Sequence, residues 1–152
     1  MAQATEDKAG AAAAEQPTDG VKIVGIVCNW CSYAGADGAG TARLKQPLNV
    51  RLVRVPCTGR VDPLVAMKAF ENGADGVLIS GCHPGDCHYS DGNYYARRKF
   101  ELLDRMLPFL GVEPDRFKYT WVSASEGQRW QSVVTDFVKG VETLGPREGR
   151  AL

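Results

Sequence analysis

Residues 21–31 read VKIVGIVCNWC, a nearly continuous apolar run that ends in two cysteines. A short run of this kind is typical of a strand that is buried in a parallel sheet. The same order, a strand pattern followed by cysteine, recurs at residues 50–57 (VRLVRVPC) and 75–82 (DGVLISGC). The run at 50–56 alternates at most positions, which predicts a strand with one exposed face.

Helix patterns alternate with the strand patterns along the chain. They lie at residues 35–46, 62–73, 91–110 and 125–141, and a fourth strand pattern lies at 116–122. Pro108 is expected to end or kink the long helix one turn early. This alternation predicts an α/β fold with a flavodoxin-like open parallel sheet of four strands, order 2-1-3-4, and helices on both faces.

Length and composition set limits on organisation and function. The chain has 152 residues, 44% of them hydrophobic, which is enough for one domain with a real core. We expect a flexible extension at 1–20, a single domain at 21–144 and a tail at 145–152. Lys plus Arg equals Asp plus Glu, at 18 each, which argues against nucleic-acid binding by bulk charge.

Two further expectations concern location. No apolar stretch in the sequence is long enough to span a membrane. The first residues carry acids and no basic start, unlike a secretory signal, so a cytoplasmic location is expected. In that compartment, metal or redox chemistry is a better use of cysteine than a structural disulfide.

All five cysteines lie just past the carboxyl end of a predicted strand: Cys28, Cys31, Cys57, Cys82 and Cys87. Such ends share one edge of an open parallel sheet, and neighbouring strands lie about 4.8 Å apart. The five thiols are therefore expected to converge. The two-residue spacing in CNWC lets both sulfurs reach one iron or zinc, and the glycines and proline of GCHPGDC predict a bent loop.

Two alternatives stay open on these residues alone. Cys28 and Cys31 fit a thiol–disulfide oxidoreductase, although that leaves three thiols without a role. Four thiolates also suit a structural zinc site, although the second cysteine pair has four intervening residues instead of two.

Several polar or aromatic residues flank the cysteines. Trp30 is expected to shield the site or to pack, and Asp86 to cap the turn or the next helix. His83 and His88 each follow a cysteine, and hydrogen bonding or partner contact is expected of both. The basic run at 97–99 (RRK) is interpreted first as a solvated helix face, with a docking patch as the alternative.

Four segments together resemble a known family: CNWCSYAGAD (28–37), VPCTGRVDP (55–63), GCHPGDCHYSDGNYYARRK (81–99) and WVSASEGQRW (121–130). In order and spacing they resemble the delta subunit of methyl-viologen-reducing hydrogenase, over residues 21–144. The resemblance implies an electron-transfer subunit without catalysis of its own. It also implies one [2Fe–2S] cluster, for which four of the five cysteines suffice.

The resemblance further implies partners. One is a flavin-containing, heterodisulfide reductase A-like subunit in an electron-bifurcating complex. The other is an electron-input enzyme such as a hydrogenase, a formate dehydrogenase or another oxidoreductase. Because a relay must reach the surface, tyrosines near the cysteine loops are expected to contact partners: Tyr33, Tyr89, Tyr94 and Tyr95.

Overall fold

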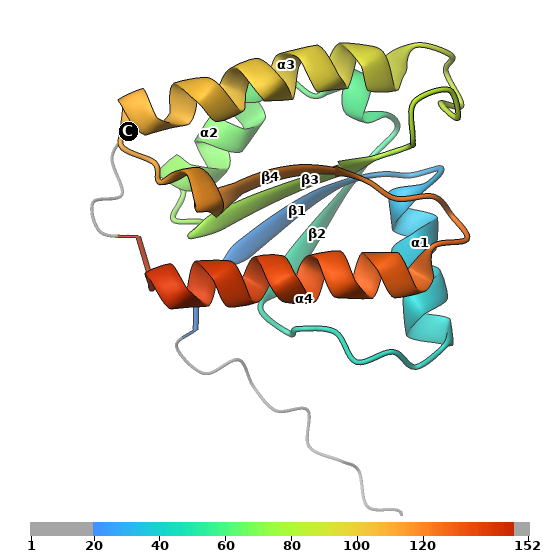
Figure 1. Cartoon of the computed structure of the whole chain (residues 1–152), viewed down its shortest axis with the longest axis horizontal. Coiled ribbons are helices and arrows are strands. Elements are labelled where there is room, and N and C mark those ends of the chain that lie inside the picture. Colours follow the sequence, from blue (N-terminus) through green and yellow to red (C-terminus); the bar gives the residue numbers. More distant parts are fainter. Residues whose placement is uncertain (1–19, 148–152) are drawn as a thin grey trace, which may run out of the picture.

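The computed structural model describes residues 20–147 as one sheet with four main helices (Figure 1). The strands are β1 (Ile23–Cys28), β2 (Val50–Val55), β3 (Gly76–Gly81) and β4 (Phe117–Trp121). The helices are α1 (Ser32–Thr41), α2 (Pro63–Glu71), α3 (Gly92–Met106) and α4 (Gly127–Leu144). All strand pairs are parallel and the order is β2-β1-β3-β4, which confirms the predicted topology.

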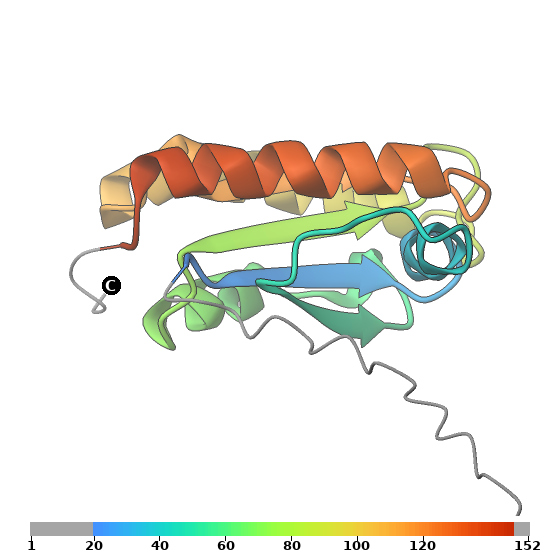
Figure 2. The same cartoon turned by 90° about the horizontal axis from the view of Figure 1, so that it is seen from below.

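The helices form one layer on each side of the sheet. The two views place α1 and α4 on one face and α2 and α3 on the other (Figures 1 and 2). Each layer has its own apolar core. Phe70, Phe100 and Leu107 centre the core under α2 and α3, and Trp130, Phe137 and Val141 centre the core under α4.

β2 differs from its prediction because it is exposed on both faces. Four consecutive residues, Arg51 to Arg54, are all exposed, whereas β3 is buried throughout. The helices cover mainly the central strands, so neither face of this edge strand lies under a complete layer. Strand patterning alone could not show which strand the helices leave uncovered.

Two helices have boundaries that bear on the sequence predictions, the end of α3 and the start of α1. α3 ends at Met106 and a 3₁₀ turn, Leu107–Leu110, follows, so Pro108 ends the helix as predicted. α1 begins at Ser32, earlier than expected, directly after Cys31. Its small residues let it approach the loop before α4 and the start of that helix: a Cβ at Gly35 would lie 2.8 Å from the carbonyl oxygen of Ser123, and a Cβ at Gly127 would lie 3.0 Å from the backbone nitrogen of Ala39.

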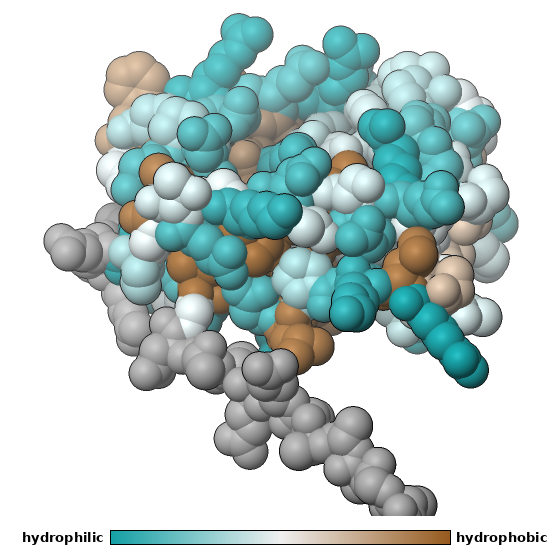
Figure 3. Space-filling view, turned by 60° about the horizontal axis from the view of Figure 1, so that its bottom comes forward, coloured by the Kyte–Doolittle hydropathy of each residue, from teal (hydrophilic) through white to brown (hydrophobic). Residues whose placement is uncertain are grey.

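The extensions predicted at 1–20 and 145–152 lie mostly outside the described residues. Of their described part, Arg147 is buried and its backbone N–H donates to Asp75. Within residues 20–147, no helix is both long and apolar enough to cross a bilayer. The face that carries α4 is mostly hydrophilic and its apolar areas are small and separate (Figure 3).

Candidate metal centre

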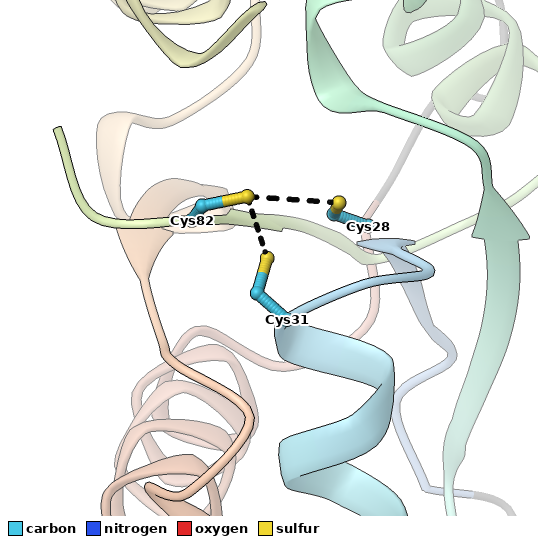
Figure 4. Close-up of side chains that lie close together, drawn as sticks. All are labelled: Cys28, Cys31 and Cys82. Carbon is cyan, nitrogen blue, oxygen red and sulfur yellow. Dashed lines mark hydrogen bonds between the residues drawn. The ribbon is translucent and has the colours of Figure 1, made fainter. Parts of the chain in front are cut away.

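Three cysteine thiols meet at the carboxyl edge of the two central strands. Cys28 is the last residue of β1, Cys31 precedes α1 and Cys82 follows β3. All three side chains are buried, and their sulfur atoms lie within 4.8 Å of one another. Figure 4 shows dashed lines from the Sγ of Cys82 to the other two sulfurs, which lie 3.8 Å (Cys28) and 3.0 Å (Cys31) away.

The remaining two thiols form a pair beside this trio. Cys57 lies in the turn after β2 and its Sγ is 3.9 Å from that of Cys87. Cys87 packs against the buried trio, so the five thiols form one group. This is the convergence that the strand-end positions predicted.

Two glycines allow the thiol pair to sit where it does. A Cβ on Gly92, the first residue of α3, would overlap the Sγ of Cys57 and lie 3.1 Å from that of Cys87. A Cβ on Gly59 would lie 2.5 Å from the carbonyl oxygen of Gly92. The Cys57 turn and the start of α3 therefore approach each other backbone to backbone, and a side chain at either glycine would separate them.

Hydrogen bonds and crowding set the protonation of the thiols. Hydrogen bonds from Cys31 and Cys82 lower the pKa of Cys28 to about 2, and the bond to Cys28 raises the pKa of Cys31 to about 11. Burial raises the pKa of Cys57, although the backbone N–H of Gly59 donates to its sulfur at 3.4 Å. One thiolate is thus stabilised in the trio, and a bound cation would displace the protons of its neighbours.

A histidine–carboxylate pair joins the loop after Cys82 to the segment that precedes α4. The Nε2 of His83 lies 2.7 Å from an Oε of Glu126, which also accepts the backbone N–H of Ser123. Both contacts lower the pKa of Glu126, and the hydrogen bond from the Ser123 N–H has the larger effect. Glu126 is a functional candidate that the sequence did not reveal, because it marks the start of a helix and its contact with His83 spans 43 residues.

The other flanking residues lie at the surface. Trp30 is 47% exposed, its ring stacks on His88 at a centroid distance of 3.8 Å, and its Nε1 donates to the hydroxyl of Tyr89. The expected cap by Asp86 is wrong: among the described residues its carboxylate has no hydrogen bond. Asp91 takes the N-cap position of α3.

Of the tyrosines expected to contact partners, three are about half exposed: Tyr89, Tyr94 and Tyr95. Tyr33 is only partly exposed and packs against the core under α4, with the guanidinium of Arg54 4.8 Å from its ring centroid.

Lys99 is a second residue whose role the sequence concealed. Its ammonium donates to the carbonyl oxygens of Gly59 at 2.8 Å and Val61 at 2.7 Å, so it holds the Cys57 turn against α3. The interpretation of the basic run as a solvated face is therefore wrong for this residue. The available signal was its helical spacing, which places it on the same face as the buried Ala96 and Leu103.

The sequence of this chain is similar to those of known iron–sulfur subunits. Residues 23–145 match the family model described as "Methyl-viologen-reducing hydrogenase, delta subunit". An iron–sulfur subunit of the F420-non-reducing hydrogenase of Archaeoglobus profundus is 52% identical over 124 residues, 82% of this chain and 90% of that protein. The corresponding vhc iron–sulfur subunit of Methanococcus voltae is 50% identical over 125 residues, 82% of this chain and 87% of that protein.

A relative of another kind is much longer. The A-type subunit of the Ferredoxin/F(420)H(2)-dependent CoB-CoM heterodisulfide reductase of Methanosarcina acetivorans is 42% identical over 124 residues, which cover 82% of this chain but only 16% of that protein. The same domain thus occurs either alone as a small subunit or within a large one. The family match spans every strand and all five cysteines, and the chain belongs to the family of the delta subunit of methyl-viologen-reducing hydrogenase.

Proposed function

We propose that this chain is an electron-transfer subunit that holds one [2Fe–2S] cluster among its five cysteines. The observation that supports this most is the convergence of five free thiols from three strand ends into one group. Cysteine thiolates are the usual ligands of such clusters, and two of the relatives described above are named iron–sulfur subunits.

The sulfur–sulfur distances favour a particular ligand set. Two sulfurs on one tetrahedral metal with bonds of about 2.3 Å lie about 3.8 Å apart. Cys28 and Cys82 are separated by 3.8 Å, and Cys57 and Cys87 by 3.9 Å. We assign the first pair to one iron and the second pair to the other.

Cys31 is then the thiol that is not a ligand. Its Sγ is 3.0 Å from that of Cys82, too short for two sulfurs on the same tetrahedral iron, and the hydroxyl of Ser32 lies 3.6 Å from it. At this position the Cys31 thiol would donate a hydrogen bond to a ligand sulfur. Such donors raise the potential of a cluster.

The surrounding chain holds these thiols in place. The Gly59 N–H points at the Cys57 sulfur, and Gly92 leaves the space that the Cys57–Cys87 pair needs. Cys28 and Cys82 are buried, so water is excluded from their side of the thiol group. A bound cluster would supply storage for one electron, which is useful only between two other redox centres.

The partners in this proposal are redox subunits. We propose a flavin-containing, heterodisulfide reductase A-like subunit for one neighbour, within an electron-bifurcating complex. A hydrogenase, a formate dehydrogenase or another oxidoreductase would be the electron-input enzyme. The names and lengths of the relatives support this, because the same domain occurs in hydrogenase subunits and within a long heterodisulfide reductase chain.

Anaerobic purification of the chain tests the cofactor. About two irons and two sulfides per chain, with visible absorbance, are expected. A colourless protein with one zinc would instead establish the structural zinc site. A colourless, metal-free protein that reduces disulfides would establish a dithiol oxidoreductase of Cys28 and Cys31.

Single serine variants test the ligand set. Cys57→Ser should lose the cluster or change its EPR signal strongly, because its turn offers no other cysteine. Cys31→Ser is the matched variant and should keep about two irons per chain, because the Cys31 sulfur is not a ligand in this assignment. Loss of iron in Cys31→Ser, together with full retention in Cys28→Ser, would show that the assignment is wrong.

A further inference from the structure

A groove opens at the surface beside Cys57. Its cavity of about 510 Å³ is lined by Cys57 and Gly59 from the turn after β2, by Gly92 at the start of α3, and by Pro56, Arg60, Tyr89, Asp91 and Tyr95. A second hollow of about 280 Å³ shares Pro56 and Tyr89 with the first and extends to Trp30 and Arg54. We call the two together the Cys57 groove. Its walls combine aromatic rings with the backbone of the thiol-bearing turn.

The charge around the Cys57 groove is positive. Arg54 and Arg60 line it, and the guanidinium of Arg98 lies 4.9 Å from the ring centroid of Tyr95 on its wall. Within residues 20–147, none of these three arginines makes an ion pair, and Asp91 is the one carboxylate in the lining. The chain as a whole has no net charge, so this is a local excess of positive charge.

The groove also offers a short route to the thiol group. Cys57 lines the cavity directly, whereas Cys28, Cys31 and Cys82 do not line it and pack together at the ends of β1 and β3. Cys57 is itself mostly buried by the chain, and this cavity is one that it lines. A partner seated here would approach the Cys57–Cys87 side.

We infer that the Cys57 groove is the docking site for an acidic segment of the redox subunit that exchanges electrons with this chain, with an apolar side chain inserted beside Cys57. This inference rests on the proposed electron-transfer function. Arginine and tyrosine are the residue types that dominate protein–protein hot spots, and charge complementarity steers and orients the encounter. The apolar walls favour a protein side chain over a small free anion.

Small charged electron acceptors test the groove without a partner. The anaerobically reduced holoprotein is mixed with ferricyanide, an anion, or hexaammineruthenium(III), a cation, and oxidation of the protein is followed by stopped flow. Arg60→Glu and Arg98→Glu should each slow oxidation by the anion and speed oxidation by the cation, about tenfold each at 0.1 M ionic strength, by the screened charge interaction over about 8 Å. The ratio of the two rates, anion to cation, should therefore fall about a hundredfold. Arg105→Glu, the same change in the exposed last turn of α3, is the control and should leave the ratio within twofold.

The outcomes separate this inference from the proposed function. A chain that binds no iron and sulfide would refute the function itself. A chain with an intact cluster and the same rate ratio in all three variants would refute only the groove. Inorganic phosphate at low-millimolar concentration gives a further test. If it slows oxidation by ferricyanide to the rate found with hexaammineruthenium(III), the groove is a site for small anions and the inference is overturned.

The native complex provides the second measurement. The double variant Arg60→Glu/Arg98→Glu should lose the redox subunit during size-exclusion chromatography at an ionic strength at which the Arg105→Glu complex stays intact. Equal retention of the partner by both variants would show that the acidic segment does not dock here.

Discussion

Replacing Lys99 by methionine removes the charge that ties α3 to the Cys57 turn while keeping a side chain of similar length. The ammonium donates two hydrogen bonds, at 2.8 and 2.7 Å, to the carbonyl oxygens of Gly59 and Val61. A hydrogen bond that involves a charged group contributes about 1.5–3 kcal/mol. Because Lys99 is only half-buried and water can replace part of the interaction, we expect the free energy of unfolding to fall by about 1.5–3 kcal/mol in total.

Urea unfolding of the metal-free, reduced protein at pH 7 measures this change. Arg105→Met is the matched control, because Arg105 lies on the same helix, is exposed and has no side-chain hydrogen bond among the described residues; its effect should stay within about 0.5 kcal/mol. Lys99→Arg should recover part of the loss, since it keeps the charge and several donors.

The holoprotein provides an independent readout of the same residue. Removing a positive charge behind the Cys57 turn disfavours the more negative, reduced cluster, so the midpoint potential of Lys99→Met should shift to more negative values. A general loss of stability would not move the potential in this way. Unfolding free energy and potential both equal to those of the Arg105→Met control would show that Lys99 is solvated and that the reasoning is wrong.

Two further changes test neighbouring contacts. Gly92→Ala places a Cβ against the Sγ of Cys57 and should reduce the iron bound per chain by at least half, measured by iron analysis after anaerobic reconstitution; unchanged iron content would contradict the close approach. The pKa of Glu126 is lowered in the folded protein, first by the hydrogen bond from the backbone N–H of Ser123. Its ionised carboxylate therefore stabilises the fold above the unfolded pKa of about 4.3, and this contribution is lost as the pH falls through the pKa of the folded protein. Glu126→Gln should therefore cost up to about 1 kcal/mol at pH 7, small because the group is largely solvated, and almost nothing near pH 2 in urea unfolding; a difference that persists in acid would contradict this origin.

The fold and the convergence of the cysteines could be predicted because the signals for both are local. Apolar runs that end in cysteine, separated by helix patterns, specify parallel strands whose carboxyl ends share an edge. The order 2-1-3-4 then places the cysteine-bearing strands side by side, as β2, β1 and β3 are.

The residues that hold the site could not be predicted, because their contacts join distant parts of the chain. Lys99 looks like one member of an exposed basic run until the turn after β2 is placed beside α3. Glu126 looks like a helix start until the loop after β3 brings His83 to it. The exposure of β2 on both faces likewise depends on where the helices lie over the sheet, which strand patterning does not encode.

These distant contacts also predict how the protein behaves when a metal is removed. The Cys57 turn is tied to α3 by Lys99, and the backbone of the Cys82 loop is tied to the same helix by Asn93, whose Nδ2 donates to the His83 carbonyl oxygen at 2.6 Å. Ser80 joins the end of β3 to α1 through the hydroxyl of Ser32 at 2.9 Å.

Each loop that carries thiols is therefore fixed by contacts that involve no sulfur. The two apolar cores, one on each face of the sheet, do not depend on these loops. Small metal-dependent domains unfold on chelation because they lack such a core. Here, removal of iron under reducing conditions should leave the far-ultraviolet circular dichroism nearly unchanged and a cooperative thermal transition at a lower temperature. Loss of cooperative unfolding in the iron-free protein would show instead that the thiols, once ligated, hold these loops together and that the contacts of Lys99, Asn93 and Ser80 are too weak to do so.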